Sequence, residues 1–517
     1  MFSMVLVMLL SSQYRHNFSG AASTALPVED QPDHLPSLSV RPLSVPLMNH
    51  ASVEHPQLDA YFNDLLSFPE ESPGDCSLDL TCLEEIPPFE PSEPQYFMPA
   101  VARLPFPQHL QYAKGTIRPN HRSQSRQDED VRQAYDDWKT HYLIEVSPPD
   151  SAEGPLYRVS FGSTAPQRTV SEGQGYGMII MAMMAGYEPE AQQFFDGLWR
   201  FSRQHPSQKD LNLMAWEVPE PPGGASSAFD GDVDMAFALL LADQQWGSDG
   251  RINYHAEAID YITAIFDSTI GPGSSLPLLG DWVDPDGDEY NQYTTRSSDF
   301  MPLNFRAFNQ KMKQELGHYF PQGESDLEIP QLALQIGTLW FDVLHAGQAA
   351  VTSVQHKVSS LTGLIPDFLV SSIDAKGISP AAGHFLEGPN DGAYSYNAAR
   401  VPWRIGTDAL LSGDPVSMRQ TRKLANWIAT ASKGDPRQIR GGYHLDGTPL
   451  GNRFTTAFAA PFGVALMTTP KHQQLLNKLY DVVYSARSDY YEDTVSLLSL
   501  LVMTGNFWSP CSGRCDE

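Results

Sequence analysis

The stretch TVSEGQGYGM, residues 169–178, places one carboxylate, Glu172, among three glycines and a tyrosine, just before an apolar run. Three glycines in five positions weaken a helix start, so we expect the helix to begin near residue 177. The glycines would then let another molecule approach the backbone closely. The alternative is that Ser171 caps a helix and Glu172 merely favours its dipole.

Outward from this stretch, apolar residues recur at three- and four-residue spacing, which predicts helices with one buried face. Phe194, Leu198 and Phe201, for example, share one face. Convincing alternating strands are few, with candidates near 156–161 and 441–445. The twelve helical runs are 125–143, 177–186, 190–203, 232–246, 254–267, 302–310, 330–346, 403–411, 417–433, 455–467, 471–487 and 491–504.

Twelve consecutive helices can pair as six helical hairpins that close into a double ring, an all-α toroid. Such a ring carries its long loops at one end, where they can form an open cleft. An irregular helical array would explain the helix count equally well. The content of the loops decides between the two.

Aromatic side chains and carboxylates gather in these loops. The segments are LMAWEV (213–218), AFDGDVDMAFALLLADQQW (228–246), GDWVDPDGDEYNQYTTRSSDFMP (280–302) and HFLEGPNDGAYSYNAARVPWR (384–404). Aromatic rings stack on the C–H faces of sugars, and carboxylates bind pairs of hydroxyls. This combination favours a carbohydrate ligand.

Each candidate also has a purely structural interpretation. Asp230 could cap the helix that follows it, and Asp232 and Asp234 suit the positive end of that helix. Trp216 and Trp403 could be core residues. The DPDGDE segment lacks the rest of a calcium loop, so we expect a solvated turn and no metal. The GQGYG glycines lack a lysine and do not follow a clear strand, which argues against a phosphate loop.

Glu172 is the hardest of these residues to explain structurally. A carboxyl group beside Tyr176 and next to a Met- and Ile-rich helix should be partly desolvated, which raises its pKa. A carboxylic acid that keeps its proton near neutral pH can act as a general acid, as cleavage of a glycosidic bond requires.

The chain is strongly acidic, with 34 Lys and Arg against 62 Asp and Glu residues, a net charge of −28. Nucleic acids and anionic membranes need basic patches, so we expect neither as a partner. The charge would suit a cationic ligand, or it could simply be a solubilising surface. No apolar run reaches the roughly 20 residues of a transmembrane helix.

The first 100 residues differ from the rest, with 14 acidic residues against two arginines and 13 of the 41 prolines. We expect a signal or leader at 1–25, an acidic, Pro-rich and disordered segment at 26–100, a catalytic domain at 101–510 and a Cys-containing tail at 511–517. The apolar start lacks a positive n-region, which makes it an atypical secretion signal. Cys76, Cys82, Cys511 and Cys515 allow local disulfides, one bridge between the tails, or free thiols.

Several motifs resemble glycoside hydrolase family 8 in the same order: SEGQGYGM, LMAWEV, DGDVDMAFALLLADQQWG and YSYNAARVPWRI. The resemblance runs from about Tyr112 to Trp508. It implies an (α/α)6 toroid with an open cleft for an extended polysaccharide, and hydrolysis with inversion without metal or cofactor. By that resemblance Glu172 is the general acid and Asp230 holds the sugar at the cleavage point. The expected substrate-binding residues are Tyr176, Trp216, Asp232, Tyr396, Asn397, Arg400 and Trp403.

The catalytic base departs from the usual family pattern. Many members use an aspartate where this chain has Asn397, and an amide cannot take a proton from water at useful pH. Relatives with this asparagine form the branch of chitosanases and licheninases (β-1,3-1,4-glucanases), whose base is a glutamate in an insertion just ahead. Glu387 matches that insertion best, Asp391 is the fallback, and Glu387 could also be an ordinary surface residue. For inversion, the Glu387 and Glu172 carboxyls should lie about 6.5–9.5 Å apart.

The sequence therefore predicts a secreted, monomeric, endo-acting inverting hydrolase of β-1,4-linked polysaccharide. Chitosan or mixed-linkage β-glucan is the first substrate choice, ahead of cellulose derivatives. The alternative is a catalytically inactive glycan-binding protein that kept the cleft and lost the base.

Overall fold

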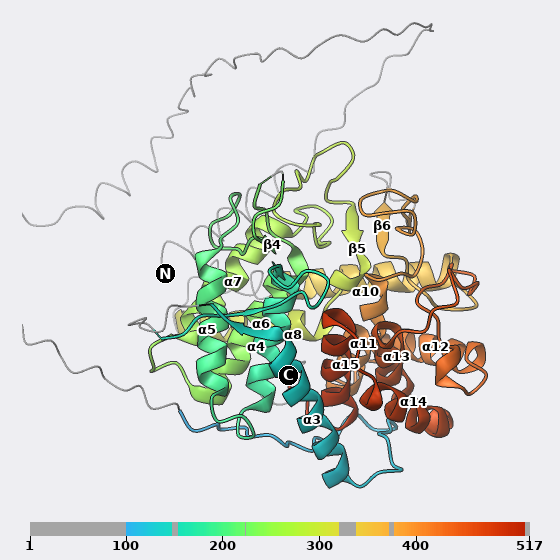
Figure 1. The fold of residues 1–517 in the computed structure, drawn as a ribbon. Helices are drawn as coiled ribbons and strands as arrows, with labels where there is room; N and C mark the ends of the chain where they lie inside the picture. Colours follow the sequence, from blue (N-terminus) through green and yellow to red (C-terminus); the bar gives the residue numbers. More distant parts are fainter. Residues whose placement is uncertain (1–99, 147–153, 223, 320–337, 372–376, 512–517) are drawn as a thin grey trace, which may run out of the picture. The chain divides into compact units, whose positions relative to one another are not determined.

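Helices dominate this computed structural model, which describes residues 100–146, 154–222, 224–319, 338–371 and 377–511 (Figure 1). The expected leader, the acidic segment, Cys76, Cys82 and Cys515 lie outside the described residues. The predicted domain boundary at residue 101 therefore stays a prediction. No helix in the described ranges is long and apolar enough to cross a membrane.

Twelve α-helices form among the described residues, and each overlaps one run predicted from the sequence, although part of the run 330–346 is not described. They are α3 (Gln124–Tyr142), α4 (Ser171–Met184), α5 (Ala191–Gln204), α6 (Phe229–Trp246), α7 (Tyr254–Thr269), α8 (Pro302–Tyr319), α10 (Leu339–Lys357), α11 (Val401–Leu411), α12 (Pro415–Ala431), α13 (Thr456–Leu466), α14 (Gln473–Ser485) and α15 (Tyr490–Met503).

Every second helix belongs to an inner ring. Along this ring α4 packs on α6, α6 on α8, α8 on α11, α11 on α13 and α13 on α15, and α15 contacts α4 to close it. The outer helices α3, α5, α7, α10, α12 and α14 pack against the inner ones. In Figure 1 the green helices α4 to α6 lie on one side and the orange and red helices α11 to α15 on the other. The predicted (α/α)6 toroid is confirmed.

The two rings differ in how they are buried. All eleven residues of α13 and thirteen of the fourteen in α4 are buried, as expected of helices that are apolar all round. The outer helix α5 instead buries one face that includes the predicted Phe194, Leu198 and Phe201. Because inner and outer helices alternate along the chain, the inner helices begin at the same end of the ring.

The start of α4 corrects the sequence prediction. The helix begins at Ser171, not near residue 177, so Glu172 lies in its first turn. A Cβ on Gly175 would lie 2.7 Å from Cβ of Asp234, and one on Gly231 would lie 2.5 Å from the carbonyl carbon of Ser171. These glycines let α4 and α6 pack backbone to backbone, and no second molecule is needed to explain them. This packing outweighs the cost of roughly 1 kcal/mol that each glycine imposes on a helix.

Short antiparallel strands form between the helices. They are β1 (Leu143–Glu145) with β2 (Tyr157–Val159), β3 (Thr169–Val170) with β4 (Glu217–Val218), and the sheet β5 (Thr294–Arg296), β6 (Phe368–Ser371) and β7 (Ile378–Pro380). The strand predicted near 156–161 is confirmed by β2. The one predicted near 441–445 is wrong, because Tyr443 makes only isolated bridges there.

The three-stranded sheet was not predicted. It lies between the core of the ring, in which Leu369 of β6 is buried, and a second, smaller apolar core built from Leu278, Leu279, Val283, Phe368 and Ala381. Phe385 and Leu386 pack against this small core, so it anchors the loop that carries Glu387.

Candidate active site

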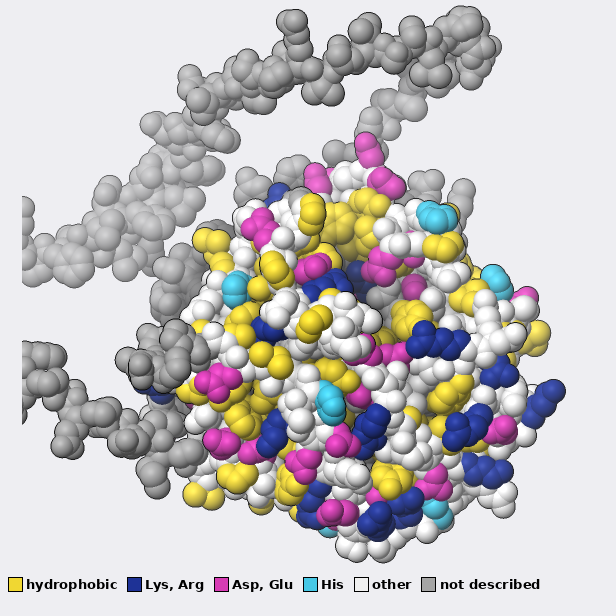
Figure 2. Space-filling view, viewed as in Figure 1, with side chains coloured by type: hydrophobic (Ala, Val, Ile, Leu, Met, Phe, Trp, Pro, Cys, Tyr) yellow, Lys and Arg dark blue, Asp and Glu magenta, His cyan; other side chains and the backbone are white. Residues whose placement is uncertain are grey.

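A cleft of about 540 Å³ opens where the inner helices begin. Figure 2 shows a hollow on this face in which acidic and basic side chains lie close together. The cleft is lined by Phe161, Arg168, Val170, Ser171, Glu172, Trp216, Ala228, Asp230, Arg296, Glu387, Tyr396, Asn397, Arg400, Tyr491 and Glu492.

Helix starts supply the central side chains of the cleft. Glu172 is the second residue of α4, Asp230 the second of α6, and Tyr491 the second of α15. Arg400 ends the short helix η2 (Ala398–Arg400) directly before α11. The two carboxylates thus face the positive ends of their helix dipoles, which favours them there.

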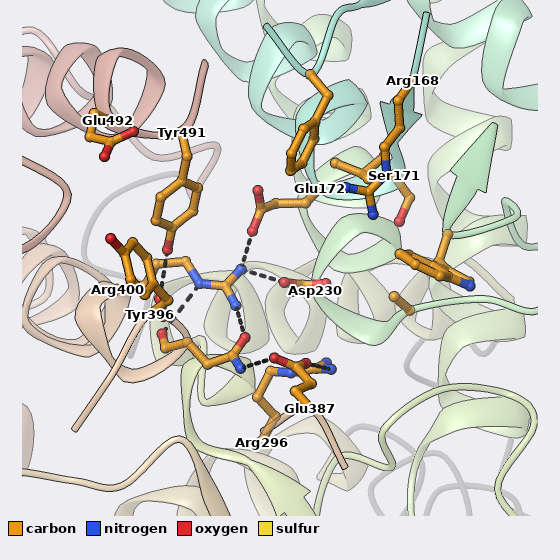
Figure 3. A pocket seen from close by; sticks show the side chains of 15 residues that line it. Arg168, Ser171, Glu172, Asp230, Arg296, Glu387, Tyr396, Arg400, Tyr491 and Glu492 are labelled. Carbon is orange, nitrogen blue, oxygen red and sulfur yellow. Dashed lines mark hydrogen bonds and ion pairs between the residues drawn. The ribbon is translucent and has the colours of Figure 1, made fainter. Parts of the chain in front are cut away.

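Arg400 connects the walls of the cleft (Figure 3). Its Nη1 donates to Oε2 of Glu172 at 2.6 Å and to Oδ2 of Asp230. Its Nη2 donates to the Ser298 hydroxyl at 2.8 Å and to the side-chain carbonyl of Asn397 at 3.0 Å. A single nitrogen of this buried guanidinium therefore donates to the carboxyl groups of both Glu172 and Asp230.

The pKa values of these two carboxyl groups shift in opposite directions. Burial raises the pKa of Glu172, Asp230 raises it further, and Arg400 only partly opposes the rise. Burial would also raise the pKa of Asp230, but Arg400 and Arg296 outweigh it and the pKa is lowered. The arrangement favours a protonated Glu172 beside an ionised Asp230, which is the separation an acid and its charged partner need.

Glu172 has a second partner that the sequence analysis missed. The Tyr490 hydroxyl donates to Oε1 of Glu172 at 3.0 Å. A Cβ on Gly173 would lie 2.8 Å from that hydroxyl, so the first glycine of the motif makes room for Tyr490. The sequence analysis left Tyr490 directly before the last predicted run, 491–504, and gave it no role.

Glu387 faces the cleft from the small core. Asn397 donates its side-chain N–H to Oε2 of Glu387 at 2.8 Å, and Arg296 donates to Oε1 at 3.1 Å. The Glu387 side chain remains 49% exposed. Figure 3 shows Glu172 and Glu387 on opposite sides of Arg400, so that Arg400 and Asn397 link the two carboxyl groups.

Asp391, the fallback for the base, does not line the cleft. It is only 3% exposed, and both of its carboxylate oxygens accept backbone N–H groups of residues 386–388. Of the two candidates, only Glu387 can meet a water or a sugar in the cleft.

Two predicted aromatic contacts lie behind the cleft wall. Tyr176 is fully buried, and its hydroxyl accepts N–H groups from Arg400 at 3.5 Å and from Arg404 at 3.4 Å. Trp403 is also buried and packs edge-on against Tyr176, with ring centroids 5.8 Å apart. Both fill the inner ring, so their prediction as substrate-binding residues is wrong and the core alternative holds for Trp403.

Asp232 is a third correction. It is fully buried and accepts the Tyr261 hydroxyl at 2.5 Å and the Met214 backbone N–H at 3.1 Å. Burial raises the pKa of Asp232 to about 8. Successive residues of a helix turn by about 100°, so Asp232 points about 200° away from Asp230 and cannot share the cleft with it.

Aromatic surfaces lie to either side of the central carboxylates. Tyr396 is 43% exposed, and the Tyr491 hydroxyl donates to its backbone carbonyl at 2.8 Å. Beyond Glu172, Trp216 and Arg168 line the wall, and the Arg168 guanidinium lies 5.6 Å from the Trp216 ring centroid. Figure 3 shows Tyr396 and Arg168 on opposite sides of Glu172, so the cleft can hold a chain that extends past the carboxylates in both directions.

The predicted Trp216, Tyr396, Asn397 and Arg400 thus line the cleft. Phe161, Arg168, Tyr491 and Glu492 join them, as does Arg296 from the loop 280–302, although none of these five was predicted as a site residue. Within the described ranges, no three His, Cys, Asp or Glu side chains are grouped so as to hold a metal ion.

Comparison with known proteins places these features in context. The model of the glycosyl hydrolases family 8 matches residues 104–315. The chain is 39% identical to the beta-glucanase of Niallia circulans over 420 residues, which cover 80% of this chain and 94% of that protein. It is 37% identical to an endoglucanase of Bacillus sp. (strain KSM-330), over 78% of this chain and 82% of that protein.

A solved structure extends the likeness to three dimensions. The apo structure of a beta-1,3-1,4-glucanase from Paenibacillus sp. X4 superposes with a TM-score of 0.70 at 38% identity. The match covers 78% of this chain and 99% of that one.

Proposed function

This chain belongs to glycosyl hydrolase family 8 and is an endo-acting glycosidase, and we propose that it hydrolyses a neutral, mixed-linkage β-glucan with inversion at the anomeric carbon. The observation that carries this proposal is the link from Glu172 through Arg400 and Asn397 to Glu387 across the cleft. It sets one carboxyl group on each side of the space where a sugar would lie.

In the proposed reaction, Glu172 gives its proton to the glycosidic oxygen as the bond from that oxygen to the anomeric carbon breaks. Water attacks the opposite face of the anomeric carbon, and Glu387 takes the proton that the water loses. The ionised Asp230 holds the sugar at the cleavage point. Solvent then returns a proton to Glu172 and removes one from Glu387.

The hydrogen bonds of Glu172 support a proton on Oε1 and not on Oε2. Oε2 accepts an N–H of Arg400 and cannot carry a proton toward that donor. The acidic proton therefore rests on Oε1, where the Tyr490 hydroxyl can accept it in place of donating. Tyr490 thus orients the acid until the glycosidic oxygen replaces it.

Asn397 complements the base. Its N–H group donates to Oε2 of Glu387, while its carbonyl accepts from Arg400. The amide is therefore held in one orientation, and it orients the Glu387 carboxylate without taking a proton itself.

The charges of the cleft support a neutral substrate. Glu172 and Asp230 share Arg400, Glu387 pairs with Arg296, and Glu492 lies 3.5 Å from a guanidinium nitrogen of Arg453. An ammonium group of chitosan would have to compete with an arginine for each of these carboxylates. The names of the relatives, a beta-glucanase and a beta-1,3-1,4-glucanase, favour the same substrate class. We therefore place chitosan second and assign the charge of −28 to solubility.

We also propose that the protein is secreted. Cys511 forms a disulfide, and its partner lies outside the described residues. Disulfides persist mainly in oxidising compartments, which supports export. Sequencing the N-terminus of the protein recovered from culture medium tests this, and an unprocessed protein retained inside cells would contradict it.

The test of the activity is a reducing-sugar assay on lichenan, chitosan, carboxymethylcellulose and xylan, with the anomer of the first product read by NMR. We expect the highest rate on lichenan and the α-anomer first. A β-anomer would reject inversion, and a higher rate on chitosan would reject the substrate class. No release from any of the four polymers would favour the inactive glycan-binding alternative.

A further inference from the structure

The loop that carries Glu387 closes around a buried carboxylate. Oδ2 of Asp391 accepts the backbone N–H groups of Leu386 at 2.7 Å and of Glu387 at 3.0 Å, and Oδ1 accepts that of Gly388 at 2.9 Å. Successive N–H groups that converge in this way form a binding site for an anion. Here the anion is a side chain of the same loop.

The rest of the loop is held on the outer side. The His384 N–H donates to the Gly388 carbonyl at 2.7 Å, and His384 adopts the left-handed backbone region at φ 61°. Phe385 and Leu386 pack into the small core, and the Tyr290 hydroxyl donates to the Phe385 carbonyl at 2.7 Å. Because the small core holds Phe385 and Leu386, the side chain of Glu387 projects the other way, into the cleft.

We propose that Asp391 is a positioning residue for hydrolysis: its carboxylate fixes the Glu387 backbone so that the Glu387 side chain meets Asn397 and Arg296. The proposal rests on the proposed role of Glu387 as base. Glu387 is half-exposed, and its two side-chain contacts span 2.8 and 3.1 Å. A displacement of about 1 Å would break both contacts and can cost on the order of 10²-fold in rate.

The geometry requires a carboxylate at this position. Both oxygens of Asp391 receive N–H groups, and an amide offers only one acceptor. Asparagine would therefore turn an NH₂ group toward at least one N–H donor and open that side of the loop.

The experiment compares Asp391→Asn with Asp435→Asn in the full chain. Asp435 also accepts a backbone N–H, that of Arg437 at 3.0 Å, but it does not line the cleft. We expect Asp391→Asn to speed hydrogen exchange at the amides of 386–388 and to lower kcat on lichenan by about 10- to 100-fold, with KM within about twofold. Asp435→Asn should leave both measurements unchanged.

Asp391→Glu is the second variant if the asparagine form does not fold. It keeps both acceptors but is one methylene longer, so it should also lower kcat while the thermal transition stays near that of the wild type. A wild-type kcat for Asp391→Glu, or for a folded Asp391→Asn, would overturn the positioning role.

Glu387→Gln separates this proposal from the proposed function. If Glu387→Gln is inactive while Asp391→Asn keeps wild-type exchange and kcat, the positioning role is wrong and the base assignment stands. If Glu387→Gln keeps its activity, the base assignment fails, and the positioning role fails with it whatever the exchange rates show.

Discussion

Replacing Glu172 with glutamine removes the proposed acidic proton and little else. The glutamine carbonyl can still accept from Arg400, as Oε2 does now at 2.6 Å. Its NH₂ group can donate to the Tyr490 hydroxyl, which lies 3.0 Å from Oε1. The substitution is therefore nearly isosteric, and substrate binding should survive it.

The size of the effect follows from the lost proton transfer. General acid catalysis contributes about 10²–10⁴-fold, so kcat on lichenan should fall by that factor. At about 1.36 kcal/mol for each factor of ten, the barrier rises by about 2.7–5.4 kcal/mol.

A substrate with an acidic leaving group gives the matched comparison. The oxygen of a dinitrophenyl glycoside of a β-glucan oligosaccharide departs without a proton, so Glu172→Gln should hydrolyse this substrate at a rate close to that of the wild type. A loss of rate on lichenan alone would therefore indicate the lost proton, whereas a loss on both substrates would indicate a damaged cleft.

The pH profile gives a second check. Burial, Asp230 and the opposing Arg400 leave the pKa of Glu172 raised, and only its protonated form is active. On the alkaline side of the profile, wild-type kcat should therefore fall as pH rises through that raised pKa, while the acidic side reports the carboxylates that must be ionised. The alkaline limb should disappear in the variant. Equal losses on both substrates, or an unchanged alkaline limb, would refute the assignment of Glu172 as the acid.

Three further predictions follow from other parts of the structure. Glu387→Gln should lower kcat on lichenan by about 10²–10⁴-fold. In Glu387→Ala, azide should restore turnover by attacking the anomeric carbon to give the α-glycosyl azide. Activity of both variants without azide would reject Glu387 as the base. Asp232 has a pKa of about 8 in the fold against an ordinary value of 3.8, so its contribution to the free energy of unfolding should be lost as pH rises from about 4 to about 8. Asp232→Asn should flatten this slope in urea unfolding, and parallel slopes would contradict it. Gly175→Ala should lower the free energy of unfolding by about 1–3 kcal/mol, because its Cβ would lie 2.7 Å from the next helix, whereas Gly451→Ala, with nothing within 4 Å, should be nearly neutral in the same thermal melt.

The helices themselves could be predicted from the sequence. Their apolar residues repeat every three or four positions, and that period is a local property of the chain. Glu172 was also a candidate on local grounds, because an acidic residue is unusual among three glycines. Asp230 became a candidate through the family resemblance, since its position alone also suits a helix cap. The start of α4 was misplaced because its glycines make room for a neighbouring helix, which local helix propensity does not reflect. The start of α10 was misplaced as well, since the helix begins at Leu339 and the predicted run began at residue 330.

Residue type alone could not select among the acidic residues, and the preference for Glu387 over Asp391 came from the family resemblance. Asp230 and Asp232 are two positions apart, yet one faces Arg400 in the cleft and the other lies buried against Tyr261. Glu387 and Asp391 are four positions apart, yet one meets Asn397 and the other binds its own backbone. In each pair the residue type is the same or nearly so, and the direction of the side chain decides its role.

What the sequence by itself determined is the set of helices, their buried faces and the types of residue available at the loop ends. What only the tertiary structure decided is which of these residues meet. Arg400 lies 228 positions from Glu172, and Tyr490 lies 318 positions from it. Contacts over such separations form only when the ring of inner helices closes and brings their starts to one end. The pKa of Glu172 depends on that closure, because burial and the charges of Asp230 and Arg400 act on it only once the helices have packed.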